Sequence, residues 1–88
     1  MFKQYSLKDI TSYLESKDYK NRMIGEYLFV KDKAQKLDDM IDKYYDGGLG
    51  FTPSCPMSIL EAQVDSMWAY VKILEHRADL EMIDLPTR

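Results

Sequence analysis

Arginine and tyrosine residues occur near both ends of the chain, and both residue types bind small anionic ligands. Arg22 and Tyr27 lie in the first half of the sequence, and Tyr70 and Arg77 lie near its C-terminal end. Arginine binds phosphate oxygens through charge-assisted hydrogen bonds, and a tyrosine ring can stack on a nucleobase. If the segments that carry these residues pack antiparallel, the four residues come together. We therefore predict a binding site at Arg22, Tyr27, Tyr70 and Arg77 for one small anionic ligand.

Further cations would surround this site and make it positive on an otherwise acidic protein. They are Lys17, Lys20 and His76, with Tyr19 as another aromatic ring nearby. A second interpretation of the same residues stays open, in which Arg22 and Arg77 pair with neighbouring carboxylates such as Glu26 and Glu81. Surface ion pairs of that kind each contribute about 0–1 kcal/mol.

The sequence lacks the patterns that enzymes and metal sites need. Cys55 and His76 are the only cysteine and histidine, and an antiparallel arrangement of helices would hold them far apart. Gly47, Gly48 and Gly50 are not followed by the Lys-Ser/Thr pair of a phosphate loop. A run of acidic residues could imitate nucleic-acid phosphates or hold a metal, but interleaved lysines favour a solvated helix face. These acidic residues are Asp38, Asp39, Asp42 and Asp46. We expect no enzymatic activity, no metal and no cofactor.

Two helical segments in the first half of the chain would position part of the site. Ser6 and Asp9 have the spacing of a capping box before a short helix over residues 7–14, within an N-terminal arm of residues 1–18. Along residues 19–46, apolar residues repeat at spacings of three and four, which predicts a long helix packed against another helix. This first seam consists of Met23, Tyr27, Val30, Ala34, Leu37, Ile41 and Tyr44.

A second long helix is predicted over residues 58–83, after a Gly/Pro-rich loop over residues 47–57. Pro56 fits the first turn of this helix, and Ser58 and Glu61 have the spacing of a capping box at its start. Its seam consists of Leu60, Val64, Met67, Val71, Leu74 and Ala78. The predicted fold class is therefore all-α. We expect an antiparallel two-helix hairpin with a short N-terminal helix, forming a single domain over residues 1–88.

The long helices carry more apolar residues than one seam can bury. A second stripe on the later helix consists of Ile59, Tyr70, Ile73 and Leu80, with Trp68 also outside the seam. Because a two-helix hairpin buries only one stripe per helix, the second stripe needs another cover. We predict that copies of the chain assemble into a helical homo-oligomer, which also enlarges the small core of an 88-residue protein.

Composition excludes several classes of partner. Twelve Lys and Arg residues against fifteen Asp and Glu residues give a net charge of −3, which argues against binding to long nucleic acids. No apolar run approaches the roughly 20 residues of a membrane-spanning helix, so we expect no membrane partner. The single cysteine is typical of a protein in a reducing cytoplasm.

The pattern of both long helices resembles that of small helical-hairpin proteins of tailed bacteriophages. The matching residues include Arg22, Glu26-Tyr27 and Lys36-Leu37 in the first helix, and Leu60, Gln63, Met67, Tyr70, Leu74 and Arg77 in the second. The resemblance covers about residues 22–80. That group includes sponges that oppose the CBASS and Thoeris defence systems by sequestering cyclic nucleotides or cyclic ADP-ribose isomers. The resemblance implies an oligomer that binds its ligand between subunits with aromatic and basic side chains.

These observations lead to one main hypothesis and two alternatives. The main hypothesis is a phage-encoded anti-defence protein, located in the host cytoplasm, that sequesters a small cyclic-nucleotide-type immune signal without turning it over. The first alternative is a protein–protein inhibitor of a host defence enzyme, similar in role to an anti-CRISPR protein, that docks through Trp68 and the acidic residues. The second is a small structural or assembly protein of the phage.

Overall fold

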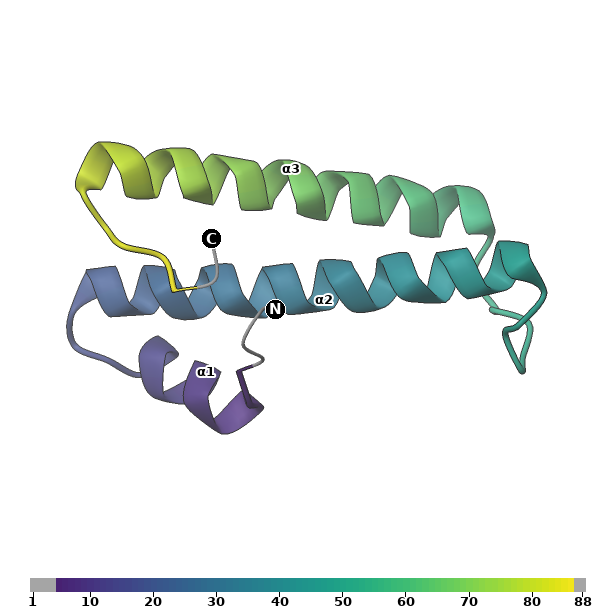
Figure 1. The fold of residues 1–88 in the computed structure, drawn as a ribbon, viewed down its shortest axis with the longest axis horizontal. Helices are drawn as coiled ribbons and strands as arrows, with labels where there is room; N and C mark the ends of the chain where they lie inside the picture. Colours follow the sequence, from purple (N-terminus) through teal and green to yellow (C-terminus); the bar gives the residue numbers. More distant parts are fainter. Residues whose placement is uncertain (1–4, 87–88) are drawn as a thin grey trace.

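The computed structural model describes residues 5–86, and all regular secondary structure in that range is helical. Helix α1 spans Leu7–Leu14, α2 spans Tyr19–Asp46 and α3 spans Met57–Glu81 (Figure 1). The molecule measures 42 × 25 × 25 Å, so its long dimension follows the two long helices. The predicted all-α fold class is confirmed.

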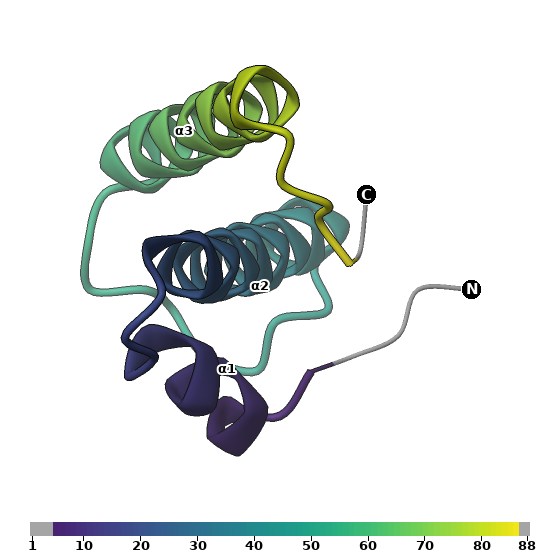
Figure 2. The same cartoon turned by 90° about the vertical axis from the view of Figure 1, so that its left-hand side faces the viewer.

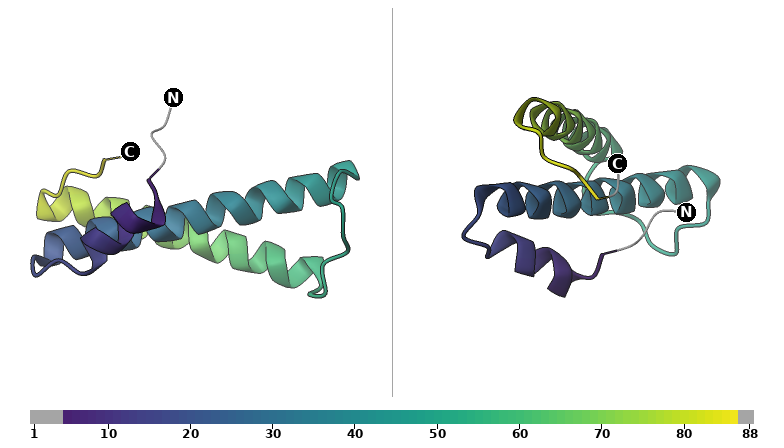
Figure 3. Two further views of the ribbon diagram at one scale, coloured as in Figure 1. Left: turned by 90° about the horizontal axis from the view of Figure 1, so that it is seen from below. Right: turned by 60° about the vertical axis from the view of Figure 1, so that its left-hand side comes forward.

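Helix α2 lies between the other two helices. Helices α2 and α3 lie side by side and run in opposite directions, and α1 packs on the other side of α2 (Figures 1 and 2). Viewed from below, α2 and α3 cross at an angle, so they diverge toward the loop that joins them (Figure 3). We call the opposite end, where α2 begins and α3 ends, the open end. The residues predicted as the binding site come from the two helix segments nearest this end.

Side-chain caps and glycine define the ends of α1 and α2. The Ser6 hydroxyl accepts a hydrogen bond from the Asp9 backbone N–H at 3.1 Å, and the Asp9 carboxylate accepts one from the Ser6 N–H at 3.2 Å. This reciprocal pair is the predicted capping box. Asp18 caps α2 by accepting from the Lys20 N–H at 3.0 Å. Gly47 ends α2 in the left-handed conformation (φ 77°), which glycine adopts without steric cost.

The core forms where the predicted seams of α2 and α3 meet. The buried seam residues are Met23, Tyr27, Ala34 and Ile41 of α2, and Val64, Val71, Leu74 and Ala78 of α3. These buried residues are four, seven and seven positions apart on α2, and seven, three and four positions apart on α3, which is the packing that a heptad pattern indicates. The periodicity therefore identified the faces of the helices that contact each other.

Gly25 allows α1 to approach α2 unusually closely. A Cβ at this position would lie 2.9 Å from the backbone nitrogen of Leu14 and 2.9 Å from the Cβ of Tyr13. No larger residue fits without movement of α1. The glycine therefore serves the contact between the two helices, although it weakens α2 by about 1 kcal/mol relative to alanine.

Both ends of α3 differ from the prediction. The helix begins at Met57, and its N-cap is Pro56, which makes no side-chain capping bond. Ser58 already lies inside the first turn, so the predicted capping box is wrong. The Pro56 carbonyl accepts instead from the backbone N–H groups of Ile59 and Leu60, at 3.0 and 3.2 Å. Proline has no N–H to satisfy, so it suits this position.

The chain folds back after α3. The helix ends at Glu81 and not at residue 83, because Met82 adopts a left-handed conformation (φ 56°). The Ile83 N–H then donates to the Ala78 carbonyl at 2.8 Å, which closes the helix end. Ile83 and Leu85 are buried in the same core cluster as Ile10 of α1. This C-terminal segment passes over α2 (Figure 1) and closes the core beside the open end.

Candidate functional site

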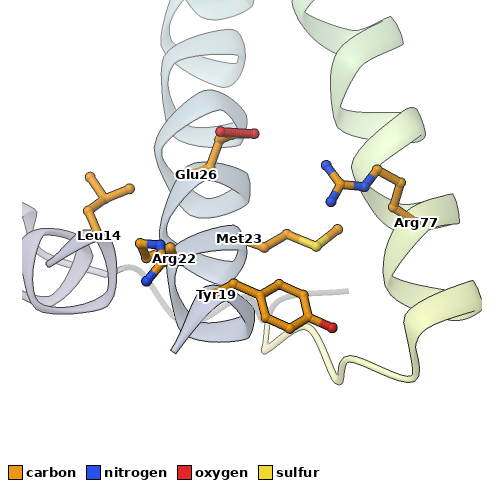
Figure 4. Close-up of a pocket in the computed structure, with 6 residues that line it drawn as sticks. All are labelled: Leu14, Tyr19, Arg22, Met23, Glu26 and Arg77. Carbon is orange, nitrogen blue, oxygen red and sulfur yellow. The ribbon is translucent and has the colours of Figure 1, made fainter. Parts of the chain in front are cut away.

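A hollow at the open end is formed by all three helices. It has a volume of about 390 Å³. Figure 4 shows Arg77 extending from α3 toward α2, and Met23 and Tyr19 pointing from α2 toward α3. The lining residues are Leu14 of α1, Tyr19, Arg22, Met23 and Glu26 of α2, and Arg77 of α3. Two of the four predicted site residues, Arg22 and Arg77, thus line one hollow although they lie far apart in the sequence.

The two arginines have different partners. One guanidinium nitrogen of Arg22, Nη1, donates to the Ser16 carbonyl at 2.9 Å, which ties the start of α2 to the segment that follows α1. Arg77 Nε lies 3.1 Å from Glu81 Oε2, one helical turn further along α3. The side chain of Arg77 is half exposed, and an exposed pair of this kind contributes about 0–1 kcal/mol. The pairing of Arg77 with a neighbouring carboxylate is therefore present but weak enough for an anionic ligand to replace it.

The negatively charged carboxylate of Glu26 lies at the edge of the hollow. Its Oε1 accepts a hydrogen bond from the Tyr70 hydroxyl, which links α2 to α3. This hydrogen bond raises the pKa of the Tyr70 phenol above its usual value, with smaller contributions from burial and from the negative charge of Glu26. Arg77 acts in the opposite direction on the same phenol. Tyr70 therefore lies beside the hollow as a hydrogen-bond donor that fixes the Glu26 carboxylate.

Tyr27 lies in the core and not in the hollow. Its side chain has 0% exposure, so neither face of its ring can stack on a ligand. Its hydroxyl donates to Glu75 Oε2 at 2.9 Å and accepts from Lys31 Nζ at 3.0 Å. The expectation that Tyr27 contacts a ligand is therefore not met. Its place in the seam, where the heptad pattern put it, explains the burial.

Tyr19 supplies the aromatic surface that was expected of Tyr27. It lies in the first turn of α2, three residues before Arg22, and the two side chains line the same hollow. Its side chain is 49% exposed, so a ring face is accessible from solvent. The helical spacing to Arg22 was the available sequence signal, because residues three apart share one face of a helix.

The other predicted features lie outside the hollow. Within residues 5–86, no group of three or more His, Cys, Asp or Glu side chains is arranged to hold a metal ion. Asp38 of the acidic run accepts a hydrogen bond from Trp68 Nε1 at 2.9 Å, so the indole packs between α2 and α3 and is only half-buried. None of the helices described in that range is long and apolar enough to cross a membrane.

The described residues form a small all-α fold with a hollow at its open end. A sequence model of one family, Sequestin, matches residues 17–80 of this chain. The match covers α2, the loop and nearly all of α3, and it contains every residue of the hollow except Leu14. No curated protein and no solved structure gives a significant match. The chain belongs to the Sequestin family, and the resemblance inferred from its sequence is confirmed. The family name itself indicates sequestration of a ligand.

Proposed function

We propose that this protein sequesters a small anionic nucleotide of the cyclic type and does not turn it over. The observation that carries the proposal is that Arg22, Arg77 and Tyr19 line one hollow; Arg77 extends toward α2, and Arg22 lies on the side of α2 that faces α1 (Figure 4). These residues come from α2 and α3, and all three lie within the segment that matches the Sequestin family.

Each part of a nucleotide has a matching group in the hollow. The two guanidinium groups offer several N–H donors to phosphate oxygens, in addition to the bonds that they already make. The accessible ring of Tyr19 can stack on a base. The Glu26 carboxylate, held by Tyr70, can accept a hydrogen bond from a ribose hydroxyl or an exocyclic amine of the ligand. A ligand with phosphates, ribose and base would use all of these groups.

Sequestration requires affinity and abundance and no chemical step. A bound signal molecule cannot reach its effector. Each occupied binding site therefore removes one molecule from the pool of free signal. We propose a phage origin and a location in the host cytoplasm, where such a protein would suppress a nucleotide-based immune signal. Self-association of the chain is part of this proposal, because the hollow is open to solvent and several large apolar side chains are exposed.

Thermal melting against a panel of nucleotides tests this function. The panel consists of cyclic dinucleotides, cyclic trinucleotides and cyclic ADP-ribose isomers. A ligand at 100 times its Kd stabilises the fold by about 2.7 kcal/mol, which raises Tm by about 10 °C or more in a protein of this size. Release of the ligand by heat, followed by chromatography, should return it chemically unchanged. The absence of any shift across the panel, or recovery of a cleaved product, would contradict the proposal.

A matched set of variants connects binding to the hollow. Arg22→Ala and Arg77→Ala should each weaken binding and leave the fold intact, because both side chains are exposed to a large degree. Lys36→Ala is the control: it also removes one exposed cation from α2, but its partner is Asp32 at 3.0 Å, outside the hollow. Equal loss of binding in all three variants would mean that net charge, and not the hollow, attracts the ligand.

The exposed aromatic residues at the loop end support a second candidate function. Tyr45 and Phe51 are 64% and 60% exposed, and Ile59 in the first turn of α3 is 57% exposed. Such a patch could dock on a host enzyme, as an inhibitor would. Trp68 contributes little to it, because its indole is held by Asp38. Binding of nucleotides that is unaffected by Phe51→Ser and Tyr45→Ser would separate the loop end from ligand capture.

A further inference from the structure

One carboxylate lies in a hollow that is otherwise suited to anions. Glu26 lines this hollow together with Arg22 and Arg77. It follows Arg22 by four residues, a separation at which opposite charges on a helix can pair. In the described part of the chain, however, Glu26 forms an ion pair with neither arginine. Arg22 Nη1 donates to the Ser16 carbonyl, and Arg77 Nε pairs with Glu81. The hollow therefore holds opposite charges that do not neutralise each other.

Separate partners hold the two charges at the α2–α3 side of the hollow. The Tyr70 hydroxyl donates to Oε1 of Glu26, and Glu81 holds Arg77. Figure 4 shows the Arg77 guanidinium extending from α3 toward α2, between the levels of Glu26 and Met23. The hydrogen bond to Glu26 is the largest cause of the raised pKa of Tyr70, and the positive charge of Arg77 lowers the same pKa. The charge of Arg77 thus acts on the pair that Tyr70 and Glu26 form.

A fixed carboxylate distinguishes ligands by their hydrogen-bond donors. An ionised carboxylate only accepts hydrogen bonds, and its two oxygens offer about four lone-pair positions, of which the Tyr70 hydroxyl uses one. The negative charge of Glu26 repels phosphate and carbonyl oxygens, so it lowers the affinity for an anion unless the ligand also brings N–H groups. An exocyclic amine on a nucleobase supplies such N–H groups, whereas a carbonyl at the same position presents an acceptor.

The neighbouring side chains would direct the edge of a base toward Glu26. Tyr19, Met23 and Glu26 are separated by four and three residues, so they share one face of α2. Met23 is buried, and its side chain points from α2 toward α3 (Figure 4). A base that stacks on the exposed ring of Tyr19 would therefore pack over the Met23 thioether, with its edge toward Glu26. Arg77 lies across the hollow, where it would hold a phosphate of the same ligand.

We propose that the hollow selects nucleotides whose base carries an exocyclic amine, and that Glu26 is the residue that determines this selection. The amine donates to the Glu26 carboxylate while a phosphate binds Arg77. A carbonyl oxygen in place of the amine would bring a lone pair against the carboxylate. Tyr70 is a positioning residue, because it acts through Glu26. This inference rests on the proposed capture of a nucleotide and specifies which nucleotides are captured.

Two matched pairs of ligands test the selection. Cyclic di-AMP and cyclic di-IMP differ by the replacement of the 6-amino group with a carbonyl oxygen, and so do cyclic ADP-ribose and cyclic inosine diphosphate ribose. In calorimetric titrations of the unmodified protein, the amine-bearing member of a pair that binds should have a Kd at least about 10-fold lower. Equal Kd values within the pair would overturn this inference and leave nucleotide capture intact. Binding of none of the four would contradict both.

The Glu26→Gln variant assigns the selection to one carboxylate. The new amide keeps an oxygen that can accept from Tyr70, so the circular dichroism spectrum should not change. The preference within the pair should fall to about 3-fold or less. Affinity for inorganic pyrophosphate, which has no N–H group, should rise about 2- to 10-fold because the repulsion is lost.

Glu81→Gln is the matched control for this variant. It also removes a carboxylate beside Arg77, but Glu81 does not line the hollow. The control should bind both members of the pair with the preference of the unmodified protein. A preference that survives in Glu26→Gln, or that is lost equally in Glu81→Gln, would overturn the role of Glu26.

The Tyr70→Phe variant tests the positioning role. The ring remains between the helices, but the Glu26 carboxylate loses the donor that holds it. The preference for the amine should fall about 3-fold or more, because the carboxylate is no longer fixed in one orientation. Pyrophosphate affinity should not rise, since the negative charge of Glu26 is still present. An unchanged preference, or a rise in pyrophosphate affinity equal to that of Glu26→Gln, would contradict the role assigned to Tyr70.

Discussion

The close contact at Gly25 makes Gly25→Ala a sharp test of how α1 is held. In most helices, replacing an interior glycine with alanine stabilises the protein by about 1 kcal/mol. Here the new Cβ would lie 2.9 Å from a backbone nitrogen, that of Leu14, and 2.9 Å from the Cβ of Tyr13. Neither atom is the tip of a flexible side chain, so the clash can be relieved only if α1 moves away from α2.

The energetic result follows from two opposing effects. Movement of α1 would expose Ile10, which is 3% exposed in the intact fold, and full burial of such a side chain contributes about 1.5–3 kcal/mol. After the gain of about 1 kcal/mol in helix propensity is subtracted, the free energy of unfolding should fall by about 0.5–2 kcal/mol. Each kcal/mol lowers Tm by about 4–8 °C in a domain of this size. Because Leu14 lines the hollow, the same movement should also weaken ligand binding.

Urea unfolding followed by circular dichroism would measure this loss, and hydrogen exchange would locate it. The amides of α1 should lose protection in the Gly25→Ala variant, and those of α3 should keep it. Gly48→Ala is the control, since the nearest atom to its added Cβ is the Lys43 carbonyl oxygen at 4.0 Å. A Gly25→Ala variant that is more stable by about 1 kcal/mol, with α1 protection unchanged, would refute the packing described for α1.

Three further predictions concern single side chains. Tyr27→Phe should lower the free energy of unfolding by about 1–3 kcal/mol in urea titrations, because its hydroxyl donates to Glu75, and it should leave ligand affinity unchanged; unchanged stability would contradict this. Absorbance titration should show that Tyr70 ionises above its usual pKa near 10, and Glu26→Gln should lower that pKa. Since the pKa is higher in the folded state, the Tyr70 contribution to stability is complete below pH 10 and is lost as the pH rises through the raised value; an unshifted phenol would argue against the bond. Met82→Gly should raise Tm, with a gain of about 0.5–1 kcal/mol, because a left-handed conformation is strained for methionine; a lower Tm would contradict this.

Local signals in the sequence predicted much of the fold. The capping box of α1 depends on two residues three positions apart, so Ser6 and Asp9 could be recognised directly. The seams depend on the periodicity of apolar residues along each helix, which can be recognised without knowledge of the partner helix. Pro56 was expected in the first turn of α3 and is its N-cap residue, but Ser58 and Glu61 have the spacing of a capping box that does not form.

Contacts between distant segments could not be predicted from the same signals. The buried positions of Ile83 and Leu85 depend on the chain reversing at Met82, a residue with no sequence preference for a left-handed turn. Within the site, the placement of Arg22 and Arg77 around one hollow followed from the antiparallel order of the helices. That order did not indicate that Tyr19, and not Tyr27, is the accessible tyrosine. Both lie near the open end, and only the packing of the helices shows which ring is enclosed.

The most direct test of the central claim is calorimetric titration of the tightest-binding nucleotide into the unmodified protein and into the Arg22→Ala, Arg77→Ala and Lys36→Ala variants. Sequestration in the hollow predicts stoichiometric binding of an unaltered nucleotide. It also predicts that either hollow variant loses at least tenfold in affinity, because hydrogen bonds to charged groups contribute about 1.5–3 kcal/mol. The Lys36→Ala variant should bind as the unmodified protein does. Full affinity in both hollow variants would show that the ligand binds elsewhere, and no binding of any nucleotide would contradict the claim itself.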